Sequence, residues 1–279
     1  MSKETALITG ASSGIGLHLA DEFARHQHPI VLVAPVEAEL VEIARQLKNS
    51  HGIEARTIAA DLEEPDAPQR LFEALKAEGI EIDILVNNAG HGQRGRYWEV
   101  PIEKHLSILR LNVEAPLRLT SLFLPTFISR RQGRILNTAS VAGFMPGPLI
   151  AVYHATKAFV LSWSEALATE VEGTGVTVTA LCPGPTDTDF FMKSEMEDAT
   201  IVHKGHVMAP QDVASAGYKA LMAGERVIVT GFINKALVFS RHLMTESAQA
   251  TLNKKQYESV PPEEETLHRG DKERAAAHA

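Results

Sequence analysis

The sequence predicts an α/β fold in which one parallel sheet is covered by helices on both faces. Short apolar runs, typical of strands buried on both sides, alternate with longer segments of helical period almost from end to end. Alternation at this spacing indicates βαβ crossovers, and therefore a doubly wound sheet. The length of 279 residues fits one such domain with a C-terminal addition.

The elements follow in order along the chain. Strands are expected at Thr5–Thr9, Ile30–Val33, Arg56–Ala59, Ile84–Val86, Arg134–Asn137, Val176–Leu181 and Arg226–Val229. The clearest helical periods are Leu17–Arg25, Ala38–Leu47, Leu106–Phe127 and Phe159–Val171. These elements predict a seven-stranded parallel sheet flanked by helices.

The pattern changes after the seventh strand. Asn234 is expected to cap a helix that continues to Tyr257. From Ser259 the composition is polar, with too few apolar side chains to offset the cost of ordering. We therefore expect a main domain over residues 1–232, a helical extension of it over 233–258 and a mobile tail over 259–279.

Composition excludes several classes of function. A net charge of −8 argues against nucleic acid as a partner, because phosphate binding needs clustered Lys and Arg. No apolar stretch approaches the roughly 18–20 residues of a membrane helix, and no signal peptide is apparent. The single cysteine, Cys182, lies in an apolar run and is expected to be buried. The histidines lack paired metal-ligand spacing. We expect a cytoplasmic protein without a metal.

A glycine-rich turn lies between the first strand and the helix after it. Gly10, Gly14 and Gly16 give the spacing G-x-x-x-G-x-G. Glycines at a strand-to-helix turn let the backbone approach a pyrophosphate, whose charge the helix N-terminus favours. Glycines also serve ordinary tight turns, but the position after the first strand favours a dinucleotide cofactor.

Further motifs follow this turn in a fixed order. They are Asp61-Leu62, Asn87-Asn88-Ala89-Gly90, Asn112, Ser140, Tyr153-x-x-x-Lys157, and Pro183-Gly184 with Thr188. Over about residues 5–232 the series resembles the short-chain dehydrogenase/reductase family, in its roughly 250-residue oxidoreductase branch. The resemblance implies a Rossmann-type fold and NAD(P)-dependent hydride transfer to or from a carbonyl or alcohol.

The resemblance also implies which residues hold the cofactor. The positions expected at the pyrophosphate and the adenosine ribose are Gly10, Ser12, Ser13, Gly14, Ile15 and Gly16. Those expected at the adenine and beside the ribose are Asp61, Leu62, Asn88, Ala89 and Gly90. Those expected at the nicotinamide end are Tyr153, Lys157, Pro183, Gly184, Thr186 and Thr188. Taken alone, the segment 87–90 can also be a simple turn.

The catalytic pair can be reasoned from chemistry. Carbonyl reduction needs a proton donor at the developing alkoxide, and alcohol oxidation needs a base there. A phenol can do both, although its pKa of about 10 is high for a base at neutral pH. Tyr153 and Lys157 lie four residues apart, on one face of a helix. An ammonium about 4 Å away can supply the roughly 4 kcal/mol that lowers the pKa of the phenol to about 7.

Ser140 and Asn112 complete the catalytic set by resemblance. Ser140 is expected to hydrogen-bond the substrate oxygen, and Asn112 to hold a water that links Lys157 to solvent. Each has an ordinary alternative, since Ser140 can cap a helix and a Tyr–Lys pair can form a packed face. His154 is expected to have a structural role or to belong to the substrate loops.

Cofactor choice and substrate remain open at this point. The second strand ends in Ala34-Pro35, without the acid typical of NAD users or the arginine typical of NADP users, which favours NADP slightly. The loops 91–98, 141–150 and 189–207 are expected to line an apolar substrate pocket. By resemblance, the third loop is expected to act as a lid, and a homodimer or homotetramer is implied.

The sequence disfavours two other functions. A non-catalytic sensor of the nicotinamide ratio is disfavoured, because sensors commonly lose part of the set that is complete here. A sugar-nucleotide epimerase or dehydratase is disfavoured by the glycine spacing and by the short sequence after Gly231.

Overall fold

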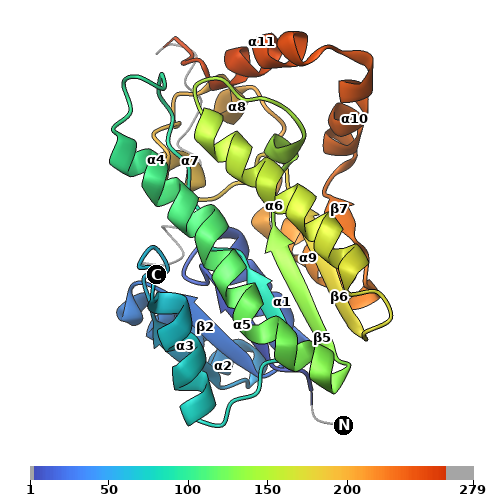
Figure 1. Ribbon diagram of the computed structural model, residues 1–279. Helices are drawn as coiled ribbons and strands as arrows, with labels where there is room; N and C mark the ends of the chain where they lie inside the picture. The colour runs from blue at the N-terminus through green and yellow to red at the C-terminus, as the bar shows by residue number, and fades with distance from the viewer. Residues whose placement is uncertain (1–2, 262–279) are drawn as a thin grey trace.

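The predicted strands form one parallel sheet in the computed structural model, which describes residues 3–261 (Figure 1). The strands are β1 (Ala6–Thr9), β2 (Ile30–Ala34), β3 (Ala55–Ala59), β4 (Ile84–Asn87), β5 (Gly133–Thr138), β6 (Val176–Cys182) and β7 (Val227–Val229). Within the described residues they run β3-β2-β1-β4-β5-β6-β7, and each neighbouring pair is parallel. The doubly wound α/β fold is therefore confirmed.

Helices cover both faces of this sheet (Figure 1). The helices between strands include α1 (Gly14–Arg25), α2 (Glu37–His51), α3 (Ala67–Ala77), α4 (Ile102–Leu109), α5 (Ala115–Arg130), α6 (Ala151–Glu170) and α9 (Pro210–Ala223). Two short helices, α7 (Phe190–Lys193) and α8 (Thr200–His203), lie between β6 and α9. In the described part of the chain, no helix has both the length and the apolar content to cross a membrane.

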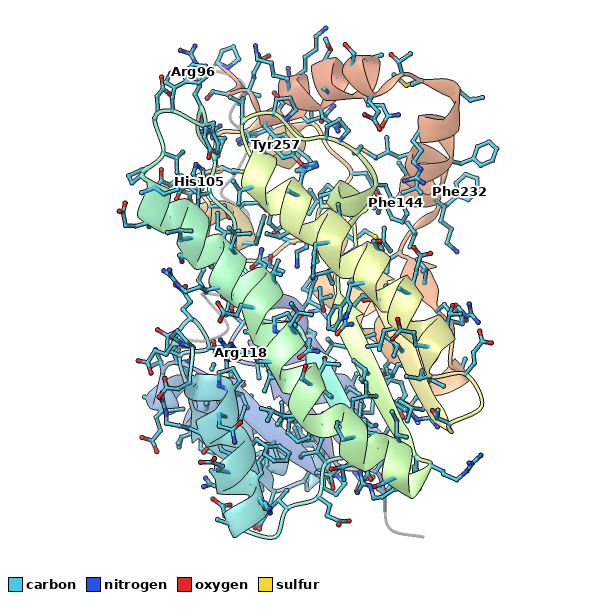
Figure 2. All side chains as sticks on the ribbon, viewed as in Figure 1. Arg96, His105, Arg118, Phe144, Phe232 and Tyr257 are labelled. Carbon is cyan, nitrogen blue, oxygen red and sulfur yellow. The ribbon has the colours of Figure 1, made fainter. Side chains whose placement is uncertain are left out.

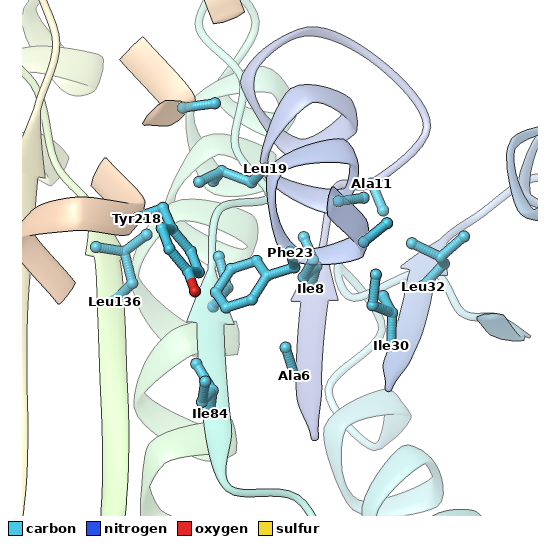
Figure 3. Close-up of a cluster of buried hydrophobic side chains, with 14 of the residues drawn as sticks. Ala6, Ile8, Ala11, Leu19, Phe23, Ile30, Leu32, Ile84, Leu136 and Tyr218 are labelled. Carbon is cyan, nitrogen blue, oxygen red and sulfur yellow. The ribbon is translucent and has the colours of Figure 1, made fainter. Parts of the chain in front are cut away.

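The core explains why the strands read as continuous apolar runs. Successive side chains of a strand point to opposite faces, and both faces are buried here. Ala6 and Ile8 pack with Phe23 of α1 and Tyr218 of α9 on one face, where the two rings meet edge-on at 5.0 Å (Figure 3). Leu7 packs on the other face, beneath α3, α5 and α6. Every residue of β1 is therefore buried.

The predicted long helix over Leu106–Phe127 is interrupted. Between α4 and α5, residues Arg110–Glu114 form one turn of π-helix, and Asn112 lies within it. A π-turn inserts one extra residue into the helix and commonly marks a functional site. Here it turns the Asn112 side chain inward, where it is 2% exposed.

The C-terminal extension differs from the prediction. Two helices, α10 (Phe232–Ser240) and α11 (Glu246–Tyr257), replace the single helix expected from Asn234. The N-cap of α10 is Gly231, so the prediction that Asn234 caps the helix is wrong. Asn234 is instead buried in the first turn, where its amide donates to the Thr230 carbonyl at 2.8 Å.

The start of the predicted tail packs against the rest of the chain. Ser259 forms a β-bridge with Ala199, and Val260 is buried. The Val260 amide donates to the Asp198 carbonyl. The rest of the predicted tail, residues 262–279, lies outside the described residues.

Candidate active site

A cavity of about 490 Å³ opens at the carboxyl ends of the strands. It lies where β1 is flanked by β2 on one side and β4 on the other, which is the switch point at which doubly wound folds bind ligands. The sequence-predicted residues that line it are Gly10, Ser12, Ser13, Gly14, Ile15, Asp61, Leu62, Asn88, Ala89, Gly90, Ser140, Tyr153, Lys157, Pro183, Gly184, Thr186 and Thr188. Gly16 and Asn112 lie behind this wall.

The glycine turn has room for a dinucleotide because its glycines carry no side chains, which would otherwise fill the space. Gly10 has φ +64°, and a Cβ there would lie 2.9 Å from the Ala89 Cα atom. A Cβ on Gly16 would lie 2.0 Å from the Gly10 carbonyl oxygen. The turn can therefore be this tight, and this close to the β4 loop, only with glycine at both positions. It leaves open backbone at the start of α1, where an anionic pyrophosphate is favoured.

The segment 87–90 is more than a simple turn, because its polar groups join three strand ends. The Thr9 hydroxyl accepts hydrogen bonds from the Asn88 and Ala89 amides at 2.9 and 3.1 Å. The Asn88 side chain donates to the Thr9 carbonyl and accepts from the Thr138 hydroxyl. The floor of the cavity is thus fixed by hydrogen bonds that link β1, β4 and β5.

Tyr153 and Lys157 lie on one face of α6, as their spacing predicts. The Lys157 Nζ atom is 5.6 Å from the Tyr153 ring centroid and donates to the Thr138 carbonyl at 2.7 Å. Burial raises the pKa of Tyr153 to about 12, although the neighbouring Ser140 hydroxyl acts to lower it. Burial also lowers the pKa of Lys157 to about 8. In the protein alone, burial therefore shifts the pKa of Tyr153 upward, opposite to the fall expected from a nearby ammonium.

Ser140 has both of the roles that the sequence left open. Its hydroxyl accepts from the Ala142 amide at 3.1 Å, so it caps the short 3-10 helix Val141–Phe144. It also donates to the Pro183 carbonyl and lines the cavity beside Tyr153. The cap fixes the rotamer of a side chain that is 8% exposed.

Asn112 is fixed by three hydrogen bonds. Its Oδ1 atom accepts from the His91 amide, and its Nδ2 atom donates to the His91 carbonyl and the Thr156 hydroxyl. A Cβ on Gly90 would lie 3.0 Å from Asn112 Oδ1 and 3.5 Å from Lys157 Nζ. Asn112 and Lys157 therefore flank the same glycine.

The outer part of the cavity has an apolar wall. Its large side chains are Ile150, Phe190, Phe191, Met196, Ile201 and Tyr257. The wall draws on the predicted loops, but Phe144 lies elsewhere and packs against Arg241 of the C-terminal extension.

Sequence reasoning missed Tyr257 as a lining residue. Lys193 lies in the loop 189–207 that was expected to line the pocket, but its contact with the glycine turn was not predicted. Lys193 Nζ lies 3.4 Å from the Ser13 hydroxyl of the glycine turn. Neither residue belongs to a motif, since each reaches the cavity only through the folding of a distant segment.

The end of β2 offers no cation of its own. Ala34, Pro35, Val36 and Glu39 line the cavity there, whereas Glu37 opens α2. Among the described residues lining the cavity, Lys157 and Lys193 supply the ammonium groups.

Comparison with known proteins agrees with this geometry. The family profile described as short chain dehydrogenase matches residues 4–199. A very-long-chain 3-oxoacyl-CoA reductase of Phaeosphaeria nodorum is 38% identical over 178 residues, which are 62% of this chain and 52% of that protein. The ketoacyl reductase HetN of Nostoc sp. is 31% identical over 226 residues, which are 79% of this chain and 76% of that one. The chain spans about half the length of the first of these relatives.

Solved structures are similar over nearly the whole described fold. A short-chain dehydrogenase from Sphingobium yanoikuyae in complex with NADPH has a TM-score of 0.77 and 33% identity, covering 86% of this chain and 94% of that one. One from Burkholderia phymatum in complex with NAD has a TM-score of 0.78 and 25% identity, covering 93% and 98%. The chain belongs to the short-chain dehydrogenase family.

Proposed function

We propose that this chain is an NAD(P)-dependent oxidoreductase that transfers a hydride between the nicotinamide and a carbonyl or secondary alcohol. The observation that carries the proposal is the meeting of Ser140, Tyr153 and Lys157 in one cavity that also contains the glycine turn. The cofactor, when bound, supplies or accepts the hydride. The lining residues from the glycine turn to Thr188 would hold it.

Tyr153 is proposed to give the proton to the carbonyl oxygen. With a pKa raised to about 12, its phenol is neutral at physiological pH and therefore ready to donate. Ser140 would turn its one hydroxyl proton from the Pro183 carbonyl to the same oxygen and so orient the substrate. Lys157, whose pKa is about 8, keeps its proton at neutral pH and stabilises negative charge on the phenol. Asn112, beside Lys157, would hold the water through which that proton is replaced.

The preferred cofactor is proposed to be NADPH. Ala34, at the end of β2, replaces the carboxylate typical of NAD users. Lys193, which also lies 4.0 Å from the Asp189 carboxylate, brings an ammonium to Ser13 in the glycine turn. Glu39 also lines this end and opposes the preference. The balance favours NADPH because Lys193 contacts the turn itself. Parallel titration with NADPH and NADH tests this choice, and tighter NADH binding would overturn it.

The substrate is proposed to be a carbonyl carried on an apolar framework. The support is the aromatic and aliphatic wall around Phe190 and Met196. Burial of apolar substrate surface against this wall would favour binding. Two relatives are named for reduction of oxoacyl or ketoacyl compounds, which is consistent with carbonyl reduction.

Tyr153→Phe tests the central proposal. The variant keeps the ring and loses the proton donor, so turnover should fall at least about a hundredfold while NADPH binding is unchanged. Retained turnover would refute the mechanism. A wild-type protein that binds NADPH but reduces no member of a broad ketone panel would instead favour the alternative, a non-catalytic sensor. No structural observation favours that alternative.

We propose that the chain forms a homodimer or homotetramer. Apolar side chains are exposed along α4, at Ile102, Leu106 and Leu109. Phe232 of α10 is 86% exposed and points away from the sheet (Figure 2). Analytical ultracentrifugation of the full chain would test this, with a monomer as the contrary result. A cytoplasmic location is also proposed, because a single cysteine, Cys182, cannot form a disulfide within the chain, and this fits a reducing compartment.

A further inference from the structure

The last residue of α11 returns to the active site. Tyr257 lines the cavity and packs against the apolar cluster that includes Ile150, Phe191 and Met196. Figure 2 places it above the end of α6 that carries Tyr153. Tyr257 is therefore the part of the outer wall that comes from the C-terminal extension.

His154 fixes the direction in which Tyr257 points. His154 Nδ1 lies 2.7 Å from the Met145 carbonyl oxygen, which can only accept, so Nδ1 carries the ring proton. Nε2 is then an acceptor, and the Tyr257 hydroxyl, 2.8 Å away, must donate to it. Burial lowers the pKa of His154 and raises the pKa of Tyr257, so both groups are neutral. The Tyr257 proton is thus committed to His154.

A short segment that begins at Tyr257, the C-terminal strap (residues 257–260), is hydrogen-bonded to the lid loop (residues 189–207). Arg94 donates to the Tyr257 carbonyl and forms an ion pair with Asp198. The Thr200 amide donates to the Glu258 carbonyl at 2.9 Å, and the Val260 amide to the Asp198 carbonyl at 2.8 Å. These bonds fix the backbone at and after Tyr257, and the hydrogen bond to His154 fixes its side chain.

We propose that Tyr257 determines substrate specificity by closing the outer end of the substrate chamber. Because its proton is committed to His154, it offers the substrate an aromatic wall and no free donor. That wall selects compact apolar ketones or alcohols and excludes substrates whose hydrocarbon chains would extend past the strap. The proposal rests on the proposed oxidoreductase function and names the substrate class of the same site.

The test compares chain length across variants. Full-length wild type, Tyr257→Ala, Tyr257→Phe and Leu252→Ala are each assayed with NADPH and a series of methyl ketones of increasing length. Leu252 is an exposed residue of the same helix and does not line the cavity, so it is the matched control. The length limit is the longest ketone that a variant accepts. It should be the same for wild type, Tyr257→Phe and Leu252→Ala. Tyr257→Ala should accept longer chains, with kcat/KM rising about fourfold per added methylene beyond that limit.

A binding measurement separates this proposal from the proposed function. In a Tyr153→Phe background, the change in bound-NADPH fluorescence on adding each ketone gives the length limit without turnover. A limit that moves with Tyr257→Ala, and not with Leu252→Ala, supports the proposal even if the wild type reduces no ketone. An unchanged limit in Tyr257→Ala, with NADPH affinity intact, overturns it.

Discussion

Replacing Lys193 with glutamine is expected to weaken NADPH binding about fivefold and to change NADH binding by less than about twofold. The Lys193 ammonium lies 3.4 Å from the Ser13 hydroxyl, and its side chain is 54% exposed. A phosphate charge about 4 Å from an ammonium gains about 1 kcal/mol in water and about 4 kcal/mol at an effective dielectric of about 20. Because more than half of the Lys193 side chain is exposed, the smaller value applies.

The assay is a nicotinamide fluorescence titration at fixed ionic strength. Lys193→Arg should retain the affinity, and Lys104→Gln makes the same charge change at an exposed site on α4, outside the cavity. Raising the salt to about 1 M shortens the screening length to about 3 Å and should remove most of the difference between wild type and Lys193→Gln. Equal losses for NADH and NADPH would mean that Lys193 serves the shared pyrophosphate. No loss for either would refute its role.

Two further predictions concern Lys157 and the glycine turn. The rate of carbonyl reduction should fall as pH rises through about 8, since the proton of Lys157 is lost there; a kcat/KM profile that rises across this range would contradict the assigned role. Gly16→Ala should cost about 1–3 kcal/mol in denaturant unfolding and weaken NADPH binding at least about tenfold, since its Cβ would meet the Gly10 carbonyl. Gly173→Ala, at a position with a positive φ and nothing within 4 Å, should cost about 1 kcal/mol and keep NADPH affinity; a comparable loss of NADPH affinity in this control would contradict a local effect at Gly16.

The central strands β1, β2 and β4 were predictable because burial on both faces leaves no polar alternation in them. Leu7 and Ile8 pack on opposite sides of the sheet, so both must be apolar, and the run reads directly as a strand. The interruption between α4 and α5 was not predictable in this way. The Asn112 turn is held by bonds to His91 and Thr156, which lie 21 and 44 residues away in sequence. The helical period of the local sequence carries no information about hydrogen-bond partners so far away in the chain.

The same reason separates the site residues that the sequence indicated from those that it did not. Tyr153 and Lys157 share one helix, so their spacing alone predicts that they meet. Tyr257 reaches the cavity only because α10 and α11 carry the chain back to the loop 189–207, 103 residues after its partner His154. Lys193 reaches Ser13 across 180 residues. Both contacts depend on the tertiary fold and leave no trace in residue spacing.

The largest difference between expectation and structure concerns the proton chemistry of Tyr153. An ammonium close to the phenol was expected to bring its pKa to about 7. Instead Lys157 binds the Thr138 carbonyl, and burial raises the pKa of Tyr153 to about 12 while lowering that of Lys157 to about 8. A cavity that excludes water favours the neutral form of each group. That state suits proton donation to a carbonyl oxygen and opposes proton abstraction from an alcohol. Tyr153 would need additional positive charge beside its phenol to act as a base at neutral pH.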